Sequence, residues 1–161
     1  MSRVFPGGFA GRVLLQSGDD VVLFDTSSMQ IEGNFTLGYV KHACWRSDNK
    51  MVALVTNSGV YVLDGSLHLC VSARERQHVK GVVWDKTGVL LYCTMSQVKY
   101  LLRSGEQGVI RSLDDVVYPL ALQGNRLVAM DRRGQRIVLQ INTTEFLLKV
   151  WYWRSSRIDL S

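Results

Sequence analysis

Three histidines are the residues of this chain best suited to acid–base chemistry, because imidazole titrates near neutral pH. His42 lies in an alternating apolar run beside Trp45, and His68 lies near Cys70 in a similar run. A catalytic site would also need a nucleophile and an orienting group at one place. The sequence offers no such set, so His42, His68 and His78 are interpreted as ordinary surface or half-buried histidines and no catalytic residue is predicted.

Two pairs of adjacent carboxylates could bind a hard cation or share a proton. They are Asp19-Asp20 and Asp114-Asp115. No further oxygen ligands are spaced around either pair, and aspartates in a hairpin loop commonly initiate the turn. The sequence therefore predicts turns here, with no metal ion and no cofactor.

The glycines Gly7, Gly8 and Gly11 could suggest a loop that binds phosphate. Their spacing fits neither G-x-G-x-x-G nor G-x-x-x-x-G-K, and no helix pattern follows to supply its N-terminus. Residues 1–10 are predicted to be a flexible lead-in, without the charged and apolar regions of a signal peptide.

The chain has three cysteines, an odd number, and no two of them have C-x-x-C spacing. Cys44, Cys70 and Cys93 are predicted to be reduced, mostly buried residues of a cytosolic protein, with neither disulfides nor zinc. The formal net charge of +5 permits weak attraction to acidic surfaces without requiring it. Basic and aromatic residues are not interleaved on one platform, which argues against nucleic acid as a ligand.

Two basic clusters are candidates for contact with an acidic partner or an anionic membrane. Arg132, Arg133 and Arg136 flank a predicted tight turn and form the candidate partner contact. The other cluster comprises Arg74, Arg76, His78 and Lys80. Solvated loop charge is the alternative interpretation of both clusters.

These residues are carried by short apolar, β-branched runs separated by turn residues, a pattern typical of an all-β protein. Strands are predicted near 13–16, 21–25, 40–46, 51–56, 60–64, 67–72, 79–85, 89–94, 98–102, 109–113, 117–122, 127–131, 137–141 and 146–153. Breakers such as Asn57-Ser58-Gly59 and Gly124-Asn125 favour tight turns between them.

An internal repeat organises these strands. Trp45 and Trp84 end matching runs 39 residues apart, and Asp25 and Asp64 end another matching pair at the same spacing. A period of about 40 residues with four short strands indicates a propeller blade. Equivalent positions in a repeat usually serve packing, so these four residues are predicted to form the structural core of the repeat.

The predicted fold is therefore all-β: a partial WD40-like β-propeller of about four antiparallel four-stranded blades over 11–153, with a C-terminal tail at 154–161. Whether residues 150–161 are strand, helix or tail stays open. An open ring exposes an apolar blade face, which favours self-association.

From residue 79 onward the sequence resembles the coatomer alpha subunit family, in its second WD40-like propeller. The resemblance rests on residues 79–89 (VKGVVWDKTGV), 98–100 (VKY), 105–114 (GEQGVIRSLD) and 144–146 (TEF), and residues 40–45 (VKHACW) and 23–25 (LFD) also fit. After Lys149 the chain is more aromatic than the family pattern. The related beta-prime subunit is the nearest alternative.

The resemblance implies a structural subunit of the COPI vesicle coat, acting in Golgi-to-ER and intra-Golgi transport. Its implied partners are other coatomer subunits, and its implied location is the cytoplasm and, through the assembled coat, the Golgi membrane. In this family dilysine signals are recognised by the first propeller, so no dilysine-binding residue is assigned. The alternative is another WD40 module that binds a peptide or an anionic ligand, also without catalysis.

Overall fold

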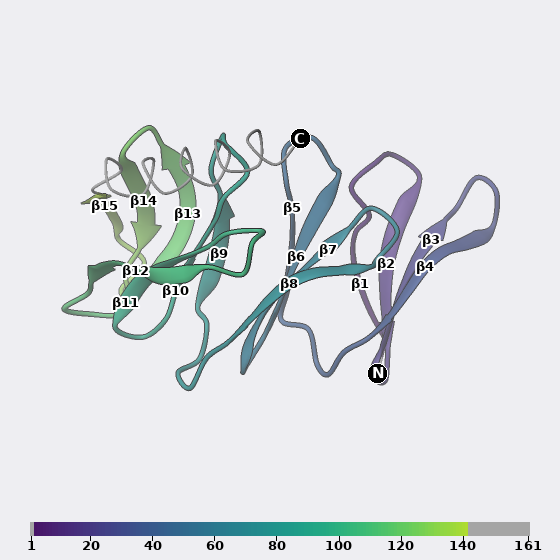
Figure 1. Cartoon of the computed structure of the whole chain (residues 1–161), viewed down its shortest axis with the longest axis horizontal. Helices are drawn as coiled ribbons and strands as arrows, with labels where there is room; N and C mark the ends of the chain where they lie inside the picture. The colour runs from purple at the N-terminus through teal and green to yellow at the C-terminus, as the bar shows by residue number, and fades with distance from the viewer. Residues whose placement is uncertain (1, 142–161) are drawn as a thin grey trace.

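The computed structural model describes residues 2–141, and every regular element among them is a strand (Figure 1). Blade 1 consists of β1 (Ser2–Pro6), β2 (Arg12–Ser17), β3 (Asp20–Asp25) and β4 (Gln30–Thr36). Blade 2 consists of β5 (His42–Trp45), β6 (Met51–Thr56), β7 (Gly59–Asp64) and β8 (Leu69–Arg74). Blade 3 consists of β9 (Gly81–Trp84), β10 (Leu90–Cys93), β11 (Gln97–Leu101) and β12 (Gln107–Ser112). Blade 4 consists of β13 (Tyr118–Gln123), β14 (Arg126–Met130) and β15 (Arg136–Gln140).

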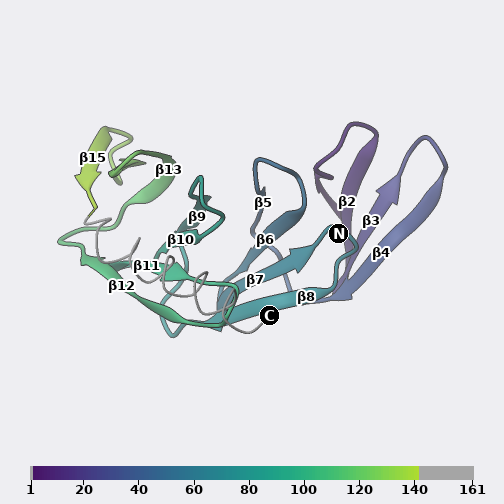
Figure 2. The same ribbon diagram turned by 45° about the horizontal axis from the view of Figure 1, so that its top comes forward.

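Each blade is an antiparallel meander whose strands pair in chain order. The four sheets stand side by side along an open arc, with blade 1 at one end and blade 4 at the other (Figure 2). This arrangement confirms the prediction of an all-β, partial propeller. The predicted strand at 146–153 and the predicted tail lie outside the described residues. The described residues hold no helix able to cross a bilayer.

The turns repeat along with the strands. In each blade the residue after the last strand donates its backbone N–H to a carbonyl in an earlier hairpin turn, at 2.6–2.8 Å. The four pairs are Leu37 with Asp19, Glu75 with Ser58, Leu113 with Ser96, and Ile141 with Asn125. The recurring breakers of the sequence therefore give the same local closure in every blade.

The core lies between blades rather than within one blade. Strand β6 illustrates the reason: all six of its residues are buried, because both faces of this sheet are covered. Three apolar clusters fill three interfaces, called here seams. Seam 1–2 contains Leu14, Val21, Leu23, Val40, Val52, Leu54, Leu63 and Leu67. Seam 2–3 contains Met51, Ala53, Val55, Val60, Val62, Ala73, Val79, Val82, Leu90, Tyr92 and Leu101. Seam 3–4 contains Val83, Val89, Leu91, Cys93, Val98, Tyr100, Leu102, Val117, Leu127, Ala129 and Ile141.

Two strands were not predicted from the sequence. Residues 2–6 were predicted to be part of a flexible lead-in, yet they form β1, which pairs with β2 in the register Val4 to Leu15. The outer strand β4 was also missed, because Glu32, Gly33 and Asn34 lower its β-propensity. An outer strand faces solvent and receives its order from the neighbouring strand, so its own sequence carries a weak signal.

Candidate functional site

The structure places the three histidines at separate surface positions, on or beside different strands. His42, His68 and His78 all have exposed side chains. His68 Nδ1 lies 3.3 Å from Asp64 Oδ2 at the surface. Partial burial, and then the charges of Lys41 and Arg3, lower the pKa of His42, so its imidazole is neutral at physiological pH.

One carboxylate of each aspartate pair accepts a hydrogen bond from a nearby group of the same blade or loop. Asp20 Oδ1 accepts a hydrogen bond of 2.9 Å from the Thr36 hydroxyl, and Asp115 Oδ1 accepts one of 2.8 Å from the backbone of Val116. Across residues 2–141, no group of three His, Cys, Asp or Glu side chains is placed to hold a metal ion.

The cysteines are free thiols. Cys93 is buried, whereas Cys44 and Cys70 are half-buried. Burial raises the pKa of the Cys93 thiol to about 12 and also raises that of Cys44. Neither forms a thiolate near neutral pH, which removes the nucleophilic form of the side chain.

The aspartates at the matched repeat positions cap their turns. Asp25 Oδ1 accepts bonds from the Ser27 hydroxyl and from the backbone N–H groups of Ser27 and Ser28, which lower the pKa of Asp25. Partial burial opposes ionisation of Asp64, but the N–H groups of His68 and Ser66 lower its pKa overall. Both side chains hold the turn between the third and fourth strands of a blade.

The matched tryptophans link neighbouring blades. Trp45 Nε1 donates to the carbonyl of Pro6 at 2.7 Å, and Trp84 Nε1 donates to the carbonyl of Cys44 at 2.9 Å. Each half-buried indole thus reaches from the first strand of its blade to the first strand of the preceding blade. Direct indole hydrogen bonds of this kind fix the distance between two blades.

Seam 1–2 is closed around its tryptophan. Gly8 has φ +86°, and a Cβ there would lie 2.9 Å from Trp45 Cε3. A Cβ on Gly33 would lie 2.5 Å from the carbonyl oxygen of Ser66. The absence of two side chains therefore lets blade 1 meet blade 2 directly.

Seam 2–3 keeps the tryptophan but has an arginine beside it. Arg46 binds the Asp48 carboxylate through Nε at 2.9 Å and Nη2 at 2.6 Å, and its Nη1 lies 3.2 Å from Met51 Sδ. Its Cζ lies 6.0 Å from the centre of the Trp84 ring. The hydrogen bonds from Arg46 lower the pKa of Asp48 to about 2. Arg46 is thus fixed as one wall of an opening.

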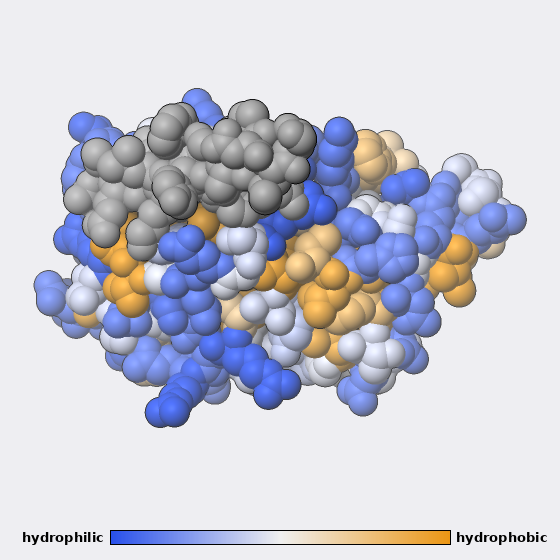
Figure 3. All heavy atoms as spheres, viewed as in Figure 1, coloured by the Kyte–Doolittle hydropathy of each residue, from blue (hydrophilic) through white to orange (hydrophobic). Residues whose placement is uncertain are grey.

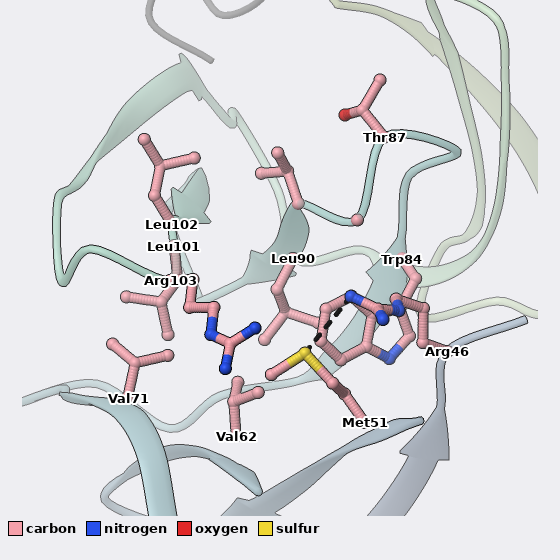
Figure 4. A pocket seen from close by; sticks show the side chains of 12 residues that line it. Arg46, Met51, Val62, Val71, Trp84, Thr87, Leu90, Leu101, Leu102 and Arg103 are labelled. Atoms are coloured by element: carbon pink, nitrogen blue, oxygen red, sulfur yellow. Dashed lines mark hydrogen bonds between the residues drawn. The ribbon is translucent and has the colours of Figure 1, made fainter. Parts of the chain in front are cut away.

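That opening is a pocket of about 150 Å³ between blades 2 and 3 (Figure 4). Its apolar lining comes from β6, β7, β8, β10 and β11, and Trp84 and two arginines lie around it. The residues are Arg46, Met51, Val62, Val71, Trp84, Thr87, Gly88, Val89, Leu90, Leu101, Leu102 and Arg103. It was not foreseen from the sequence, because its walls come from two blades.

A polar network that the sequence did not indicate also lies at this seam. Glu75 Oε1 accepts bonds from Lys99 Nζ at 2.6 Å and from the Tyr92 hydroxyl at 2.5 Å. The Lys99 and Glu75 side chains are only 17% and 11% exposed. Burial, and then the bond to Glu75, raise the pKa of Tyr92, so the phenol stays protonated as a donor.

The outer face of blade 1 is an uncovered apolar surface. This surface is formed by apolar residues that are neighbours across β1 to β4: Val4, Val13, Leu15, Val22, Phe24 and Ile31. Val4 is 66% exposed and Ile31 is 65% exposed. Apolar surface is visible at this end of the arc, beside β3 and β4 (Figure 3). One repeat further on, Val52, Leu54 and Leu63 occupy the positions of Val13, Leu15 and Phe24 and are 0% exposed.

The basic residues predicted to contact a partner are at the opposite end. All three are exposed: Arg132 and Arg133 lie in the turn between β14 and β15, and Arg136 is the first residue of β15. Arg132 Nε lies 3.6 Å from Asp115 Oδ1, with both side chains largely in solvent. Such a pair adds little stability, which leaves the charge available at the surface.

The chain matches the family model described as "COPA/B second beta-propeller" over residues 1–131. It is 36% identical over 140 residues to the "Putative coatomer subunit alpha" of Schizosaccharomyces pombe, covering 87% of this chain and 12% of that protein. It is 34% identical over 140 residues to "Coatomer subunit alpha-1" of Arabidopsis thaliana, with the same coverage of both chains. The chain thus spans about 12% of the length of these curated relatives.

Solved structures share the fold at low sequence identity. The designed Ika4 protein matches with a TM-score of 0.65 and 15% identity, covering 83% of this chain and 88% of that chain. "KlHsv2 with loop 6CD replaced by a Gly-Ser linker" matches with a TM-score of 0.63 and 13% identity, covering 86% and 49%. At these identities the likeness concerns the fold alone.

Proposed function

The chain belongs to the COPA/B second beta-propeller family, and from this we propose that it is part of a structural, non-enzymatic subunit of the COPI coat. The observation that carries the proposal is the likeness to coatomer alpha subunits over 87% of the chain. The arc of blades supports it, because propeller blades present edges and loops to other proteins. The relatives named above are alpha subunits, which does not favour the beta-prime-like alternative.

The partners proposed are the other coatomer subunits, with membrane association through the assembled coat in the cytoplasm and at the Golgi. The test is affinity purification of the tagged parent protein from its own cells, followed by mass spectrometry. The proposal expects the other coatomer subunits in near-stoichiometric amounts. A parent protein that purifies without them would overturn it.

The exposed Arg132, Arg133 and Arg136 are proposed to contact an acidic partner surface within that assembly. Exchanging Arg132 and Arg133 for Glu is expected to weaken coat assembly, because like charges then face each other. Circular dichroism and the unfolding midpoint should stay unchanged, since both side chains are exposed. Unaltered assembly of the double variant would remove this contact from the proposal.

Self-association of the isolated chain through the outer face of blade 1 is also proposed. The apolar positions there are the ones that a neighbouring blade covers in blades 2 and 3. Blade 1 carries two arginines, Arg3 and Arg12, and four acidic residues, Asp19, Asp20, Asp25 and Glu32. Blade 4 carries four arginines, Arg126, Arg132, Arg133 and Arg136, and one acidic residue, Asp131. The charges therefore favour contact between blade 1 of one copy and blade 4 of another.

Sedimentation velocity at rising concentration measures this association. The wild-type chain is expected to form dimers, and a Val4→Asp, Ile31→Asp variant is expected to stay monomeric, because both exchanged residues are exposed. Met29→Asp serves as the matched control, since Met29 is 71% exposed but lies in the turn between β3 and β4. A wild-type chain that is monomeric at every concentration contradicts the proposal.

A further inference from the structure

We propose that the pocket between blades 2 and 3 binds an acidic peptide segment of a partner protein. One apolar side chain of the segment enters the pocket, and an Asp or Glu carboxylate next to it binds Arg103. The inference follows from this pocket and is independent of the coat assignment.

The volume of the pocket limits what can enter. About 150 Å³ accommodates a group of the size of a benzene ring. Pockets for nucleotides or drug-sized ligands are at least about twice as large. A single leucine, methionine or phenylalanine side chain therefore matches the space, whereas a cofactor does not.

The floor of the pocket favours an apolar group. Met51, Val62, Leu90 and Leu101 are at most 5% exposed, and they belong to the cluster that seals the rest of seam 2–3. These side chains point into the pocket together with Val71 (Figure 4). An entering apolar side chain gains on the order of 25 cal/mol for each Å² of apolar surface that leaves water.

The two arginines at the pocket differ in their partners. Arg46 is held by Asp48, so its charge is largely compensated within blade 2. Arg103 lies in the turn between β11 and β12, and its guanidinium faces the pocket (Figure 4). Among the described residues, no hydrogen bond or ion pair engages the Arg103 guanidinium. The pocket therefore carries one uncompensated positive charge beside an apolar floor.

A carboxylate is the group that completes this arrangement. A guanidinium binds a carboxylate in a planar, two-point geometry, and a neighbouring apolar wall strengthens the bond by excluding water. A basic segment would instead meet the like charge of Arg103. The ligand that fits both parts of the site is an apolar residue adjacent to an acidic one.

The reason for the pocket is visible by comparison with seam 1–2. Gly33 pairs with Leu23, and one repeat later Val71 pairs with Val62. The backbone at Gly33 comes so close to the Ser66 turn that a side chain would not fit. Val71 has a side chain at that position and lines the pocket with Leu102 and Arg103 of the corresponding turn. The space is thus produced by specific residues of blades 2 and 3.

The test begins with phage-displayed random heptapeptides selected on the immobilised chain. Selected peptides are expected to contain an apolar residue next to Asp or Glu. Their synthetic, terminally blocked forms are then measured by fluorescence anisotropy against the wild type, Arg103→Gln and the control Arg126→Gln, an exposed arginine of blade 4. Affinity should fall at least tenfold for Arg103→Gln and stay within twofold for Arg126→Gln.

A nuclear magnetic resonance titration locates the site. The methyl signal of Met51, labelled with ¹³C, should shift on addition of the selected peptide, because Met51 lines the pocket. Selected peptides without acidic residues, equal affinity of Arg103→Gln and wild type, or an unmoved Met51 signal would each overturn the proposal. So would binding that requires a free C-terminal carboxylate, or a chain that binds vesicles of phosphatidylserine and phosphatidylcholine and no peptide.

Discussion

Seam 1–2 and seam 2–3 share the same tryptophan hydrogen bond, called here the anchor, but only seam 2–3 contains a pocket. In both, an indole N–H bonds a backbone carbonyl of the preceding blade, at 2.7 Å and 2.9 Å. Around that anchor, Gly8 and Gly33 close seam 1–2, whereas Arg46 and Val71 leave a pocket in seam 2–3. The repeated residues set the spacing of the blades, and the residues that do not repeat decide whether the space between them is filled.

The same comparison explains why the pocket has a charge. Gly7 lies one repeat of 39 residues before Arg46. Gly65 follows Asp64 as Arg103 follows Leu102 in an equivalent turn, because Asp64 N–H bonds the His68 carbonyl as Leu102 N–H bonds the Glu106 carbonyl. Positions without a side chain in seam 1–2 therefore carry guanidinium groups in seam 2–3. A repeat fold can acquire a binding site in this way without changing its strands, because each seam contacts only its neighbours.

The largest expected effect on stability comes from replacing Gly33 of seam 1–2 with valine, the residue that seam 2–3 has at the equivalent position, Val71. Gly33→Val places a side chain against the backbone of Ser66, where even a Cβ would lie 2.5 Å from the carbonyl oxygen. We expect the free energy of unfolding to fall by about 2–3 kcal/mol, measured by urea denaturation. Gly38→Val is the control, because nothing lies within 4 Å of a Cβ there. Equal losses in both variants would contradict the close contact.

Removing the anchors is expected to have an intermediate effect. Trp84→Phe leaves the Cys44 carbonyl without its donor in a partly buried place and should cost about 2 kcal/mol. Trp45→Phe should cost about 1 kcal/mol, because the Pro6 carbonyl is in an exposed place and can bind water. Urea midpoints of the two variants measure the difference. Identical losses would show that the two seams do not differ in burial at the anchor.

The smallest expected effect is that of the Arg46–Asp48 pair on acid stability. Because the folded pKa of Asp48 is lowered to about 2 from its ordinary 3.8, ionised Asp48 stabilises the fold. This contribution is complete above about pH 4 and is lost as the pH falls through about 2. For a pair so exposed it should remain below about 1 kcal/mol.

Urea unfolding of the wild type and Asp48→Asn from pH 7 to pH 2 measures that contribution. The two proteins should differ by a constant amount above about pH 4 and converge at lower pH. A difference that persists at pH 2 would mean that the carboxylate charge is not its source.

Much of the fold could be predicted from the sequence because it is encoded locally. Turn residues such as Gly124 and Asn125, and the matched positions of Trp45 and Trp84, give the strands, the repeat and the number of blades. Strands β1 and β4 were missed because their order comes from pairing with β2 and β3 rather than from their own composition.

The sequence by itself determined an all-β chain of repeating blades, since hydrogen bonding in tight turns and the alternation of apolar residues act over a few neighbouring residues. Only the tertiary structure decided where two blades touch and where they stand apart. The distances that decide this join residues 30 or more positions apart, such as Gly33 and Ser66 or Val71 and Arg103. Whether such residues meet depends on how whole sheets pack, because close packing leaves room for a side chain at one seam and excludes it at the next.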